Sequence, residues 1–370
     1  MSRLVPHREG LYEALPGRIL RSSAAALQPL VGAQARHQIL ALADELCVPV
    51  HAICYECRLQ RGDHRVDVAV CLLPMRTVGI DDVLGHLGRR HLAELPWRRY
   101  VEFLAEWSHP ASEYAASVPF VCVAFDLPID RAAVPVPGLS LCIDREFFTR
   151  LRGLPAAPPP PVSALLALAD DCHRRLHGEA LPAGSLTLLA SCLSGDDVIA
   201  KHVSYMPSRA PAAFKLDIRI PVDALAALLH RINWPGPADS VVARIRALAP
   251  GQHHVQLNLV LAPRINADLE VELLTCAVEA GSEERAAVLQ QLVDSGHCDP
   301  TKAEVLRRSS LHPVYRDTEG LIVARNWYLK VKFSGDRIAE TKAYMGLMPR
   351  VWMHPQSVVD AHKAILGNMA

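Results

Sequence analysis

Charged and aromatic side chains recur at every second position in three segments of this chain, 214–220, 327–333 and 338–347. Their polar members are Lys215, Asp217, Arg219, Tyr328, Lys330, Lys332, Lys342 and Tyr344. Because successive side chains of an extended strand point to opposite faces, each set shares one face, and apolar side chains occupy the other. A face rich in lysine and arginine can balance the charge of an anionic group such as a phosphate.

Carboxylates follow the same alternation in other segments. Glu270 and Glu272 share one strand face, Asp67 lies two positions after Arg65, and Glu56 lies two positions before Arg58. These acids either pair with the inward bases as internal ion pairs or hold Mg²⁺, which prefers oxygen ligands. Asp67 and Asp217 are the candidate metal ligands.

Glu56 is the best acid on the first predicted strand. It is positioned to anchor an N–H group of a substrate or to accept a proton. The simpler alternative is that it pairs with Arg58 on the same strand face. Both interpretations stay open at the level of the sequence.

The elements that position these residues form a regular series. Strands are predicted in five pairs, at 50–60 and 64–73, 119–127 and 138–144, 198–205 and 213–220, 254–261 and 268–276, and 326–333 and 338–347. Helices are predicted at 33–46, about 80–90, 97–108, 162–177, 185–194, 222–233, 238–248, 283–294, 299–309 and near 356–367. The order is therefore one of repeated ααββ units.

This order predicts an α+β fold, a ten-stranded antiparallel β-barrel with helices outside. Closure would leave no free sheet edge, and the helices would cover the apolar outer face. We treat residues 1–370 as a single domain with an internal proline-rich linker at 155–161. The alternatives are an open α+β sheet or two domains divided at that linker, and residues 186–192 are compatible with a strand as well as a helix.

Composition narrows the functional classes. The net charge is zero and the pI is about 7.3, which argues against nucleic-acid binding. The chain has no apolar run of the roughly 18 residues that a membrane-spanning helix needs. Its N-terminus does not resemble a secretory signal, and its cysteines lie singly in apolar segments, so we expect a cytoplasmic protein.

Three short motifs carry little weight. Cys54 and Cys57 would face opposite sides of a strand, so a zinc site is not expected. The acidic pair Asp170-Asp171 lacks the second copy that aspartate-rich prenyl synthases have. His253 and His254 would point apart.

The repeated ααββ order and the alternating bases resemble the aromatic prenyltransferase barrel, also called the ABBA or PT-barrel fold. Lys342-Ala343-Tyr344 matches the Lys-x-Tyr pattern of that family, and Cys54-Tyr55-Glu56 resembles the strand that carries a glutamate in its indole branch. The resemblance implies that the bases bind an isoprenoid diphosphate and that Glu56 is catalytic. The implied diphosphate-binding residues are Arg65, Lys215, Arg219, Tyr328, Lys330, Lys332, Lys342 and Tyr344.

The function that follows is a prenyltransferase of specialised metabolism. It would move an isoprenyl group from an isoprenoid diphosphate to an aromatic small molecule or a peptide acceptor, with Mg²⁺ as the one possible cofactor. Two rivals remain. One is a barrel with a different reaction, such as cyclisation or another modification of a peptide or natural product, and the other is a non-catalytic peptide-binding barrel.

Overall fold

The computed structural model of this protein describes most of the chain. The described residues are 5–6, 12–13, 16–46, 50–74, 94–109, 111–127, 137–144, 160–195, 197–206, 214–262, 265–273, 282–308, 314–316 and 322–350. The predicted helices at 80–90 and 356–367, the end of the strand at 274–276 and most of the 155–161 linker lie outside these ranges.

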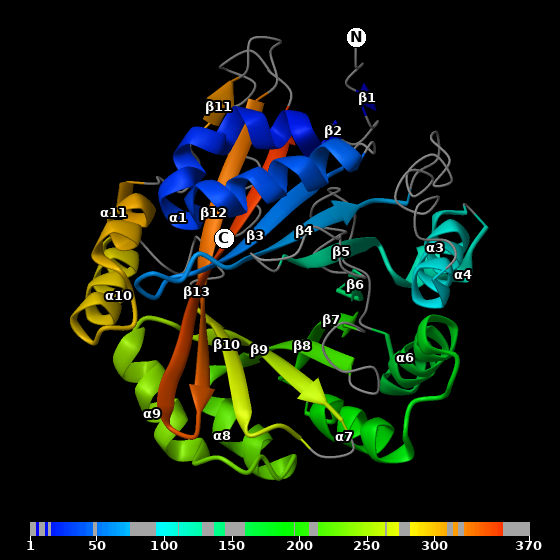
Figure 1. The fold of residues 1–370 in the computed structure, drawn as a ribbon. Coiled ribbons are helices and arrows are strands. Elements are labelled where there is room, and N and C mark those ends of the chain that lie inside the picture. The colour runs from blue at the N-terminus through cyan, green and yellow to red at the C-terminus, as the bar shows by residue number, and fades with distance from the viewer. Residues whose placement is uncertain are drawn as a thin grey trace.

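A closed antiparallel barrel forms the centre of the molecule (Figure 1). Its ten strands are β3 (Ala52–Arg58), β4 (Val66–Leu72), β5 (Phe120–Leu127), β6 (Gly138–Cys142), β7 (Ile199–Tyr205), β8 (Phe214–Pro221), β9 (His254–Leu261), β10 (Asp268–Leu273), β12 (Ile322–Ser334) and β13 (Arg337–Arg350). Neighbours in the barrel follow chain order except that β13 pairs with β3 and β10 pairs with β12. The β10–β12 pairing closes the ring, so the predicted barrel is confirmed and an open sheet is excluded.

Short strands extend this plan at two places. The strand β11 (Val314–Arg316) pairs with the first part of β12, and β1 (Val5–Pro6) pairs with β2 (Tyr12–Glu13) in a small separate sheet. Strands from both sides of the 155–161 segment share the one barrel, because β6 pairs with β7.

The helices lie outside the barrel (Figure 1). They are α1 (Pro16–Glu45), α3 (Leu95–Ser108), α4 (Glu113–Ser117), α6 (Val162–His177), α7 (Ala183–Leu193), α8 (Val222–Arg231), α9 (Ala238–Leu248), α10 (Ser282–Asp294) and α11 (Pro300–Arg308). Residues 186–192 are thus helical. The α1 helix starts 17 residues before the predicted start at 33. The prediction missed this first part because Pro29 and Gly32 interrupt the apolar period. The chain bends at Gly32, whose φ is 74°.

The hydrophobic core lies between the helices and the outer face of the barrel. Trp97, Tyr100 and Phe103 of α3 are at most 2% exposed, and outward side chains of the strands such as Phe125, Leu216 and Leu329 are fully buried. Trp107 also satisfies its indole N–H, which donates to the carbonyl of Val118 at 2.8 Å. Burial of large aromatic and aliphatic side chains in this layer is the main force that holds helices on the sheet.

The inward face of the barrel is more exposed than the outward face. Along β5 the side chains alternate between partly exposed and buried, and the partly exposed ones, Cys122 and Ala124 among them, face the interior. The apolar members, Val121, Val123 and Phe125, are at most 3% exposed. Solvent therefore reaches the interior, which is the polar surface that the alternation predicts.

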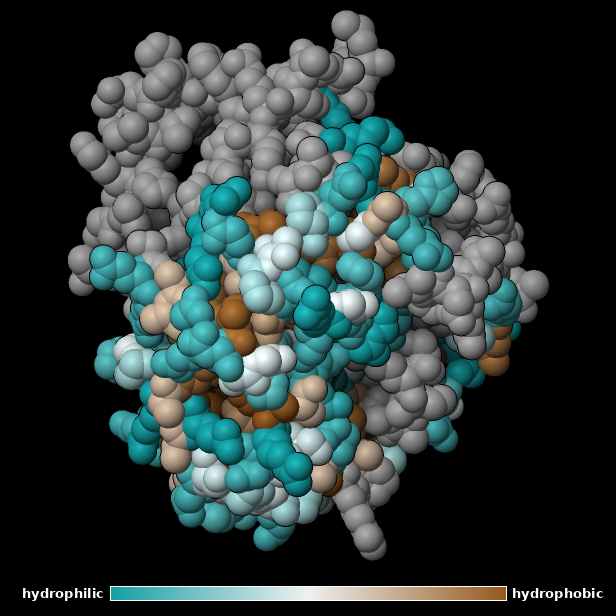
Figure 2. Space-filling view, turned by 60° about the vertical axis from the view of Figure 1, so that its left-hand side comes forward, coloured by the Kyte–Doolittle hydropathy of each residue, from teal (hydrophilic) through white to brown (hydrophobic). Residues whose placement is uncertain are grey.

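The helix side of the barrel presents a mainly hydrophilic exterior. In Figure 2 hydrophilic residues predominate over the described part of one face, with smaller hydrophobic areas between them. Within the described ranges, no helix combines the length and the hydropathy needed to cross a bilayer.

A buried lysine fastens one end of the barrel. Lys302 of α11 is 3% exposed, and its ammonium group donates to the carbonyls of Arg58 at 2.7 Å and of Gln60 at 3.4 Å. These carbonyls lie at the end of β3 and in the turn between β3 and β4, where Gly62 has a φ of 74°. The turn is the predicted hairpin, and its anchoring holds Arg58 at the edge of the site described next.

Candidate active site

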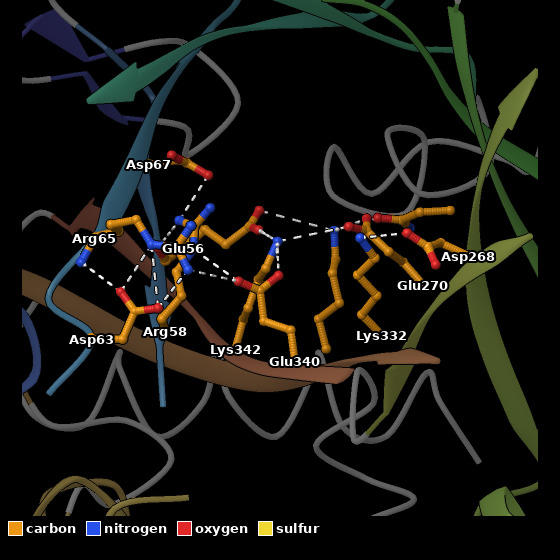
Figure 3. A network of polar contacts seen from close by, with 12 residues as sticks. Glu56, Arg58, Asp63, Arg65, Asp67, Asp268, Glu270, Lys332, Glu340 and Lys342 are labelled. Carbon is orange, nitrogen blue, oxygen red and sulfur yellow. Dashed lines mark hydrogen bonds and ion pairs between the residues drawn. The ribbon is translucent and has the colours of Figure 1, made fainter. Parts of the chain in front are cut away.

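Ionisable side chains line one side of the barrel interior, and we call this set the charged wall. They come from β3, β4, β8, β10, β12 and β13. Its members are Glu56, Arg58, Asp67, Lys215, Asp217, Arg219, Asp268, Glu270, Glu272, Lys330, Lys332, Glu340 and Lys342. Figure 3 shows most of them as a continuous band that runs from Asp63 and Arg65 at one end to Asp268 and Lys332 at the other.

Lys330 is the centre of the charged wall. It is 1% exposed, and its Nζ lies 3.3 Å from Glu272 Oε1, 3.4 Å from Glu270 Oε2 and 3.9 Å from Glu56 Oε2. It also donates to the Tyr344 hydroxyl at 2.8 Å and to the side-chain carbonyl of Asn258. A buried ammonium is tolerated only when it is paired and hydrogen-bonded, and this one is surrounded by acceptors.

Glu56 joins Lys342 and Tyr344 beside it. Lys342 Nζ lies 2.5 Å from Glu56 Oε1, 3.1 Å from Glu340 Oε2 and 3.7 Å from Glu270 Oε1. The Tyr344 hydroxyl donates to Glu56 Oε2. Lys330, Tyr344 and Glu56 thus form a chain of hydrogen bonds across β12, β13 and β3, whose register places Tyr344 opposite both Tyr328 and Glu56.

The pKa values of this cluster follow from burial and from charge pairing. Burial alone would raise the pKa of Glu56, but Lys330 and Lys342 more than offset this and hold the pKa well below its usual range. Glu270 behaves in the same way beside Lys215 and Lys330. Burial would lower the pKa of Lys330, whereas Glu270 and Glu56 raise it. Glu56, Glu270 and Lys330 are therefore charged at neutral pH.

Three ammonium groups meet at Glu270. Its Oε2 lies 3.0 Å from Lys215 Nζ and 3.4 Å from Lys330 Nζ, while its Oε1 lies 3.7 Å from Lys342 Nζ. The Tyr328 and Tyr344 rings stack nearby with centroids 4.9 Å apart and planes at 9°. Lys215, Lys330, Lys342, Tyr328, Tyr344 and Glu56 are the predicted site residues that the structure brings together.

Other predicted residues lie toward the edges of the band. Lys332 is paired with Asp268 at 2.7 Å, and both side chains are 31% exposed. Arg219 is partly buried two positions beyond Asp217 on β8, opposite Gln256 of β9. Arg65 comes just before β4 and pairs with Asp63 at 2.6 Å, with its side chain 58% exposed. These three are not part of the central cluster.

Arg58 pairs differently from its predicted alternative. Its guanidinium lies 2.8 Å from Asp67 Oδ2 and 3.5 Å from Glu340 Oε1, and it touches Glu56 only through the backbone carbonyl of that residue. The interpretation of a Glu56–Arg58 side-chain pair is therefore wrong. Neighbouring strands supply closer partners, because Asp67 lies opposite Glu56 on β4 and Lys342 lies opposite Arg58 on β13.

Two acids in the charged wall are incompletely satisfied. Asp217 is 8% exposed, its Oδ2 lies 3.6 Å from His202 Nδ1, and its Oδ1 has no hydrogen-bond partner. Glu272 is 3% exposed, and its Oε2 also has no partner. Burial raises the pKa of each carboxyl, and nearby lysines offset this only in part.

The opposite side of the interior carries small and thiol side chains over its central part, and we call this part the neutral wall. It consists of residues on β3 to β6, namely Cys54, Ala69, Cys71, Cys122, Ala124, Ser140 and Cys142. Asp126, two positions after Ala124, and the Lys201–Asp144 ion pair, two positions after Cys142, are not part of it. Burial raises the pKa of the Cys142 thiol, and hydrogen bonding to Cys71 raises that of Cys54. These thiols are neutral at pH 7, so this wall offers an apolar surface to a ligand.

Across the described ranges, no group of three histidine, cysteine, aspartate or glutamate side chains is arranged to hold a metal ion. The two predicted metal ligands interact with different partners: Asp67 pairs with Arg58, and Asp217 faces His202. The role of Mg²⁺ stays a prediction, and no step below depends on it.

Several contributors went unnoticed in the sequence. Glu340 bridges Lys342 and Arg58, and Asn258 accepts from Lys330. Both continue an alternation that was visible, Glu340-x-Lys342 and Gln256-x-Asn258. By contrast, Asp170 is structural, since it accepts from Arg174 at 2.8 Å and from the backbone N–H of Leu181 at 2.8 Å.

Comparison with known proteins gives the fold a precedent. No family model matches the chain, and no curated protein sequence matches it. Among solved structures, the apo form of the prenyltransferase PriB superposes with a TM-score of 0.52 at 12% identity, over 92% of this chain and 100% of that one. A 6-dimethylallyl tryptophan synthase superposes with a TM-score of 0.54 at 14% identity, over 91% of this chain and 99% of that one.

These likenesses extend over nearly the whole of each chain, and they agree with the ring of ten strands enclosed by helices. Sequence identity at this level carries no information about individual side chains, so the likeness concerns the path of the backbone. The chain has the PT-barrel fold, which it shares with aromatic prenyltransferases.

Proposed function

We propose that this protein is a prenyltransferase that moves an isoprenyl group from an isoprenoid diphosphate to an aromatic or peptide acceptor. The observation that carries the proposal is the convergence of Lys215, Lys330 and Lys342 on Glu270, within 3.0 to 3.7 Å of one carboxylate. In the absence of a substrate, Glu270 occupies the position of an anion between three cations. The oxygens of a diphosphate would suit the same position, because each can accept charge-assisted hydrogen bonds from these lysines.

The chemistry follows from the two walls. As the bond between the allylic carbon and the diphosphate oxygen breaks, the lysines stabilise the leaving diphosphate, and the isoprenyl cation lies toward the neutral wall. A nucleophilic carbon or heteroatom of the acceptor forms the new bond to that cation and then loses a proton. Glu56 accepts the proton once Lys330 and Lys342 have turned to the diphosphate, because losing its cationic partners raises the pKa of the carboxylate.

A second function is favoured by a specific observation. Lys215, Lys330, Lys332 and Lys342 each already lie within 4 Å of a carboxylate. A barrel whose bases are neutralised in this way needs no anionic ligand, so a repurposed barrel that modifies or presents a peptide is the alternative.

Isothermal titration calorimetry with dimethylallyl, geranyl and farnesyl diphosphates, with and without Mg²⁺, separates the two. The transferase predicts binding of at least one donor at micromolar concentration. Lys342→Ala should weaken it by about 1.5–3 kcal/mol, the loss of a charge-assisted bond, and the peripheral variant Lys332→Ala should weaken it less.

The variant Glu270→Gln, titrated in the same way, tests the proposal more directly. If Glu270 competes with the diphosphate for the three lysines, its neutral isostere should bind the donor more tightly than the native protein. No binding of any donor to either protein would reject the transferase and leave the repurposed barrel as the better account.

A further inference from the structure

Asp217 and Glu272 stand apart from the other acids of the charged wall. The acids Glu56, Glu270 and Asp67 each lie within 3.0 Å of a lysine or arginine nitrogen. Glu272 meets Lys330 at 3.3 Å through one oxygen and leaves Oε2 unpaired. Asp217 lies 3.6 Å from His202, and burial lowers the pKa of that imidazole to about 4. Asp217 therefore faces a neutral imidazole at pH 7.

The two carboxyl groups interact electrostatically. Burial raises the pKa of Glu272, Lys330 opposes this, and the charge of Asp217 adds to the rise. Both side chains face the interior, from β8 and β10, which are separated only by β9. Each thus has one buried oxygen without a hydrogen-bond partner on this side of the barrel.

This pair adjoins the neutral wall and an aromatic ring. The charge of Glu272 reaches Cys54 and Tyr328, and that of Asp217 reaches Cys122. Tyr328 is partly exposed and stacks on Tyr344. A ligand that lay between the two walls would therefore adjoin two incompletely paired carboxyl groups and one aromatic face.

We propose that Asp217 and Glu272 form a subsite that binds a guanidinium group, the side chain of an arginine residue in the acceptor. A guanidinium has five N–H donors in one plane, so it can address two carboxylates at once, and it stacks on aromatic rings such as Tyr328. It is also more weakly hydrated than an ammonium group, which favours it in a buried site. That the ligand belongs to the acceptor rests on the proposed function, whereas the binding itself does not.

The test uses the full chain and three small probes, measured by calorimetry or by ligand-observed NMR. The probes are N-acetylarginine methylamide, its neutral isostere N-acetylcitrulline methylamide, and N-acetyllysine methylamide. The arginine probe should bind about 10-fold or more tightly than the citrulline probe, the effect of a charge-assisted contact, and more tightly than the lysine probe. Equal affinity for arginine and citrulline, no measurable binding of arginine, or tighter binding of lysine would overturn the proposal.

Variants locate the effect. Asp217→Asn and Glu272→Gln remove charge without removing volume, and each should abolish most of the preference for arginine over citrulline. Asp268→Asn, a matched change at the edge of the same wall, should preserve it. The assignment would be contradicted if Asp268→Asn abolished the preference for arginine over citrulline. It would also be contradicted if the Asp217→Asn, Glu272→Gln double variant kept that preference.

The outcomes separate this subsite from the donor site. Arginine binding in a protein that binds no isoprenoid diphosphate would keep the subsite and reject the transferase. Donor binding with no preference for arginine would do the reverse. Thermal unfolding of each variant checks that the fold is intact, and neutralising an incompletely paired buried acid should not lower the unfolding temperature.

Discussion

The charged wall and the neutral wall are built by the same barrel but by different rules. On β8, β12 and β13, each inward lysine is met by an acid from another strand, and Lys330 by itself contacts Glu56, Glu270 and Glu272. On β4 and β5 the register places like against like, with Ala69 opposite Ala124 and Cys71 opposite Cys122. The charged wall fixes the positions of charged groups, whereas the neutral wall, with its small side chains, leaves space for a ligand.

The difference explains how one interior can serve a reaction with a polar and an apolar half. Fixed charges in a partly dry site need little reorganisation when a substrate's charge develops, which is the main electrostatic advantage of an active site. A neutral surface of small side chains accommodates hydrocarbon without desolvating any ion. Each of the following experiments alters one wall and measures whether the other responds.

The largest effect is expected at the centre of the charged wall. Lys330→Met should cost about 3–5 kcal/mol of unfolding free energy, because it leaves three buried carboxylates without their shared cation. Lys332→Met, the same change at the half-exposed Lys332–Asp268 pair, should cost about 0–1 kcal/mol. Urea unfolding measures both, and equal losses would show that the charged wall has no organised centre.

A change of volume tests the neutral wall. Ala124→Phe should reduce prenyl transfer by about 10- to 200-fold, since the added ring occupies space that apolar substrate groups would use. It should leave the affinity for inorganic pyrophosphate unchanged, because the three lysines lie on the other wall. Steady-state kinetics and calorimetry give the two numbers, and a parallel loss of pyrophosphate binding would refute the division into two walls.

A smaller effect is expected for Tyr344→Phe. The hydroxyl links Lys330 to Glu56, so its removal should cost about 1.5 kcal/mol of unfolding free energy, the lower end for a hydrogen bond to a charged group. The stacked ring of Tyr328 keeps its neighbour, which limits any loss of packing. If Tyr328→Phe costs as much in the same unfolding experiment, the hydroxyl link is not the cause.

The smallest effect concerns pH. The raised pKa values of Asp217 and Glu272 stabilise the fold below their ordinary values of 3.8 and 4.5, and this contribution is lost as the pH rises through the folded values. The lowered pKa values of Glu56 and Glu270 act in the opposite sense, stabilising the fold above about 4.5 and losing this contribution as the pH falls. Stability should therefore peak on the acid side of neutrality.

Unfolding curves at several pH values measure this profile. The Asp217→Asn, Glu272→Gln double variant should flatten the slope above the peak, and Glu270→Gln should flatten the slope below it. A double variant that keeps the native slope above the peak would mean that these two acids do not cause it.

Much of the fold followed from local patterns. The helices at 162–177 and 238–248 and the strand at 254–261 agree with the structure at both ends, and every predicted barrel strand is present. Period-two alternation is a property of each strand alone, so it also identified Lys215, Lys330, Lys342 and Tyr344 as sharing the inward face. The part of α1 before Gly32 was not predicted, because Pro29 breaks the apolar period there.

The pairing of charges was beyond the reach of the sequence. Which acid meets Lys330 depends on the register of β10 and β3 beside β12 and β13, and on the closure of the ring between β10 and β12. A shift of one residue would turn each side chain to the other face, and a shift of two would exchange its partners. The sequence by itself thus determined which residues face the interior, while only the tertiary structure decided which of them touch, because contacts between distant strands depend on register and ring closure rather than on local spacing.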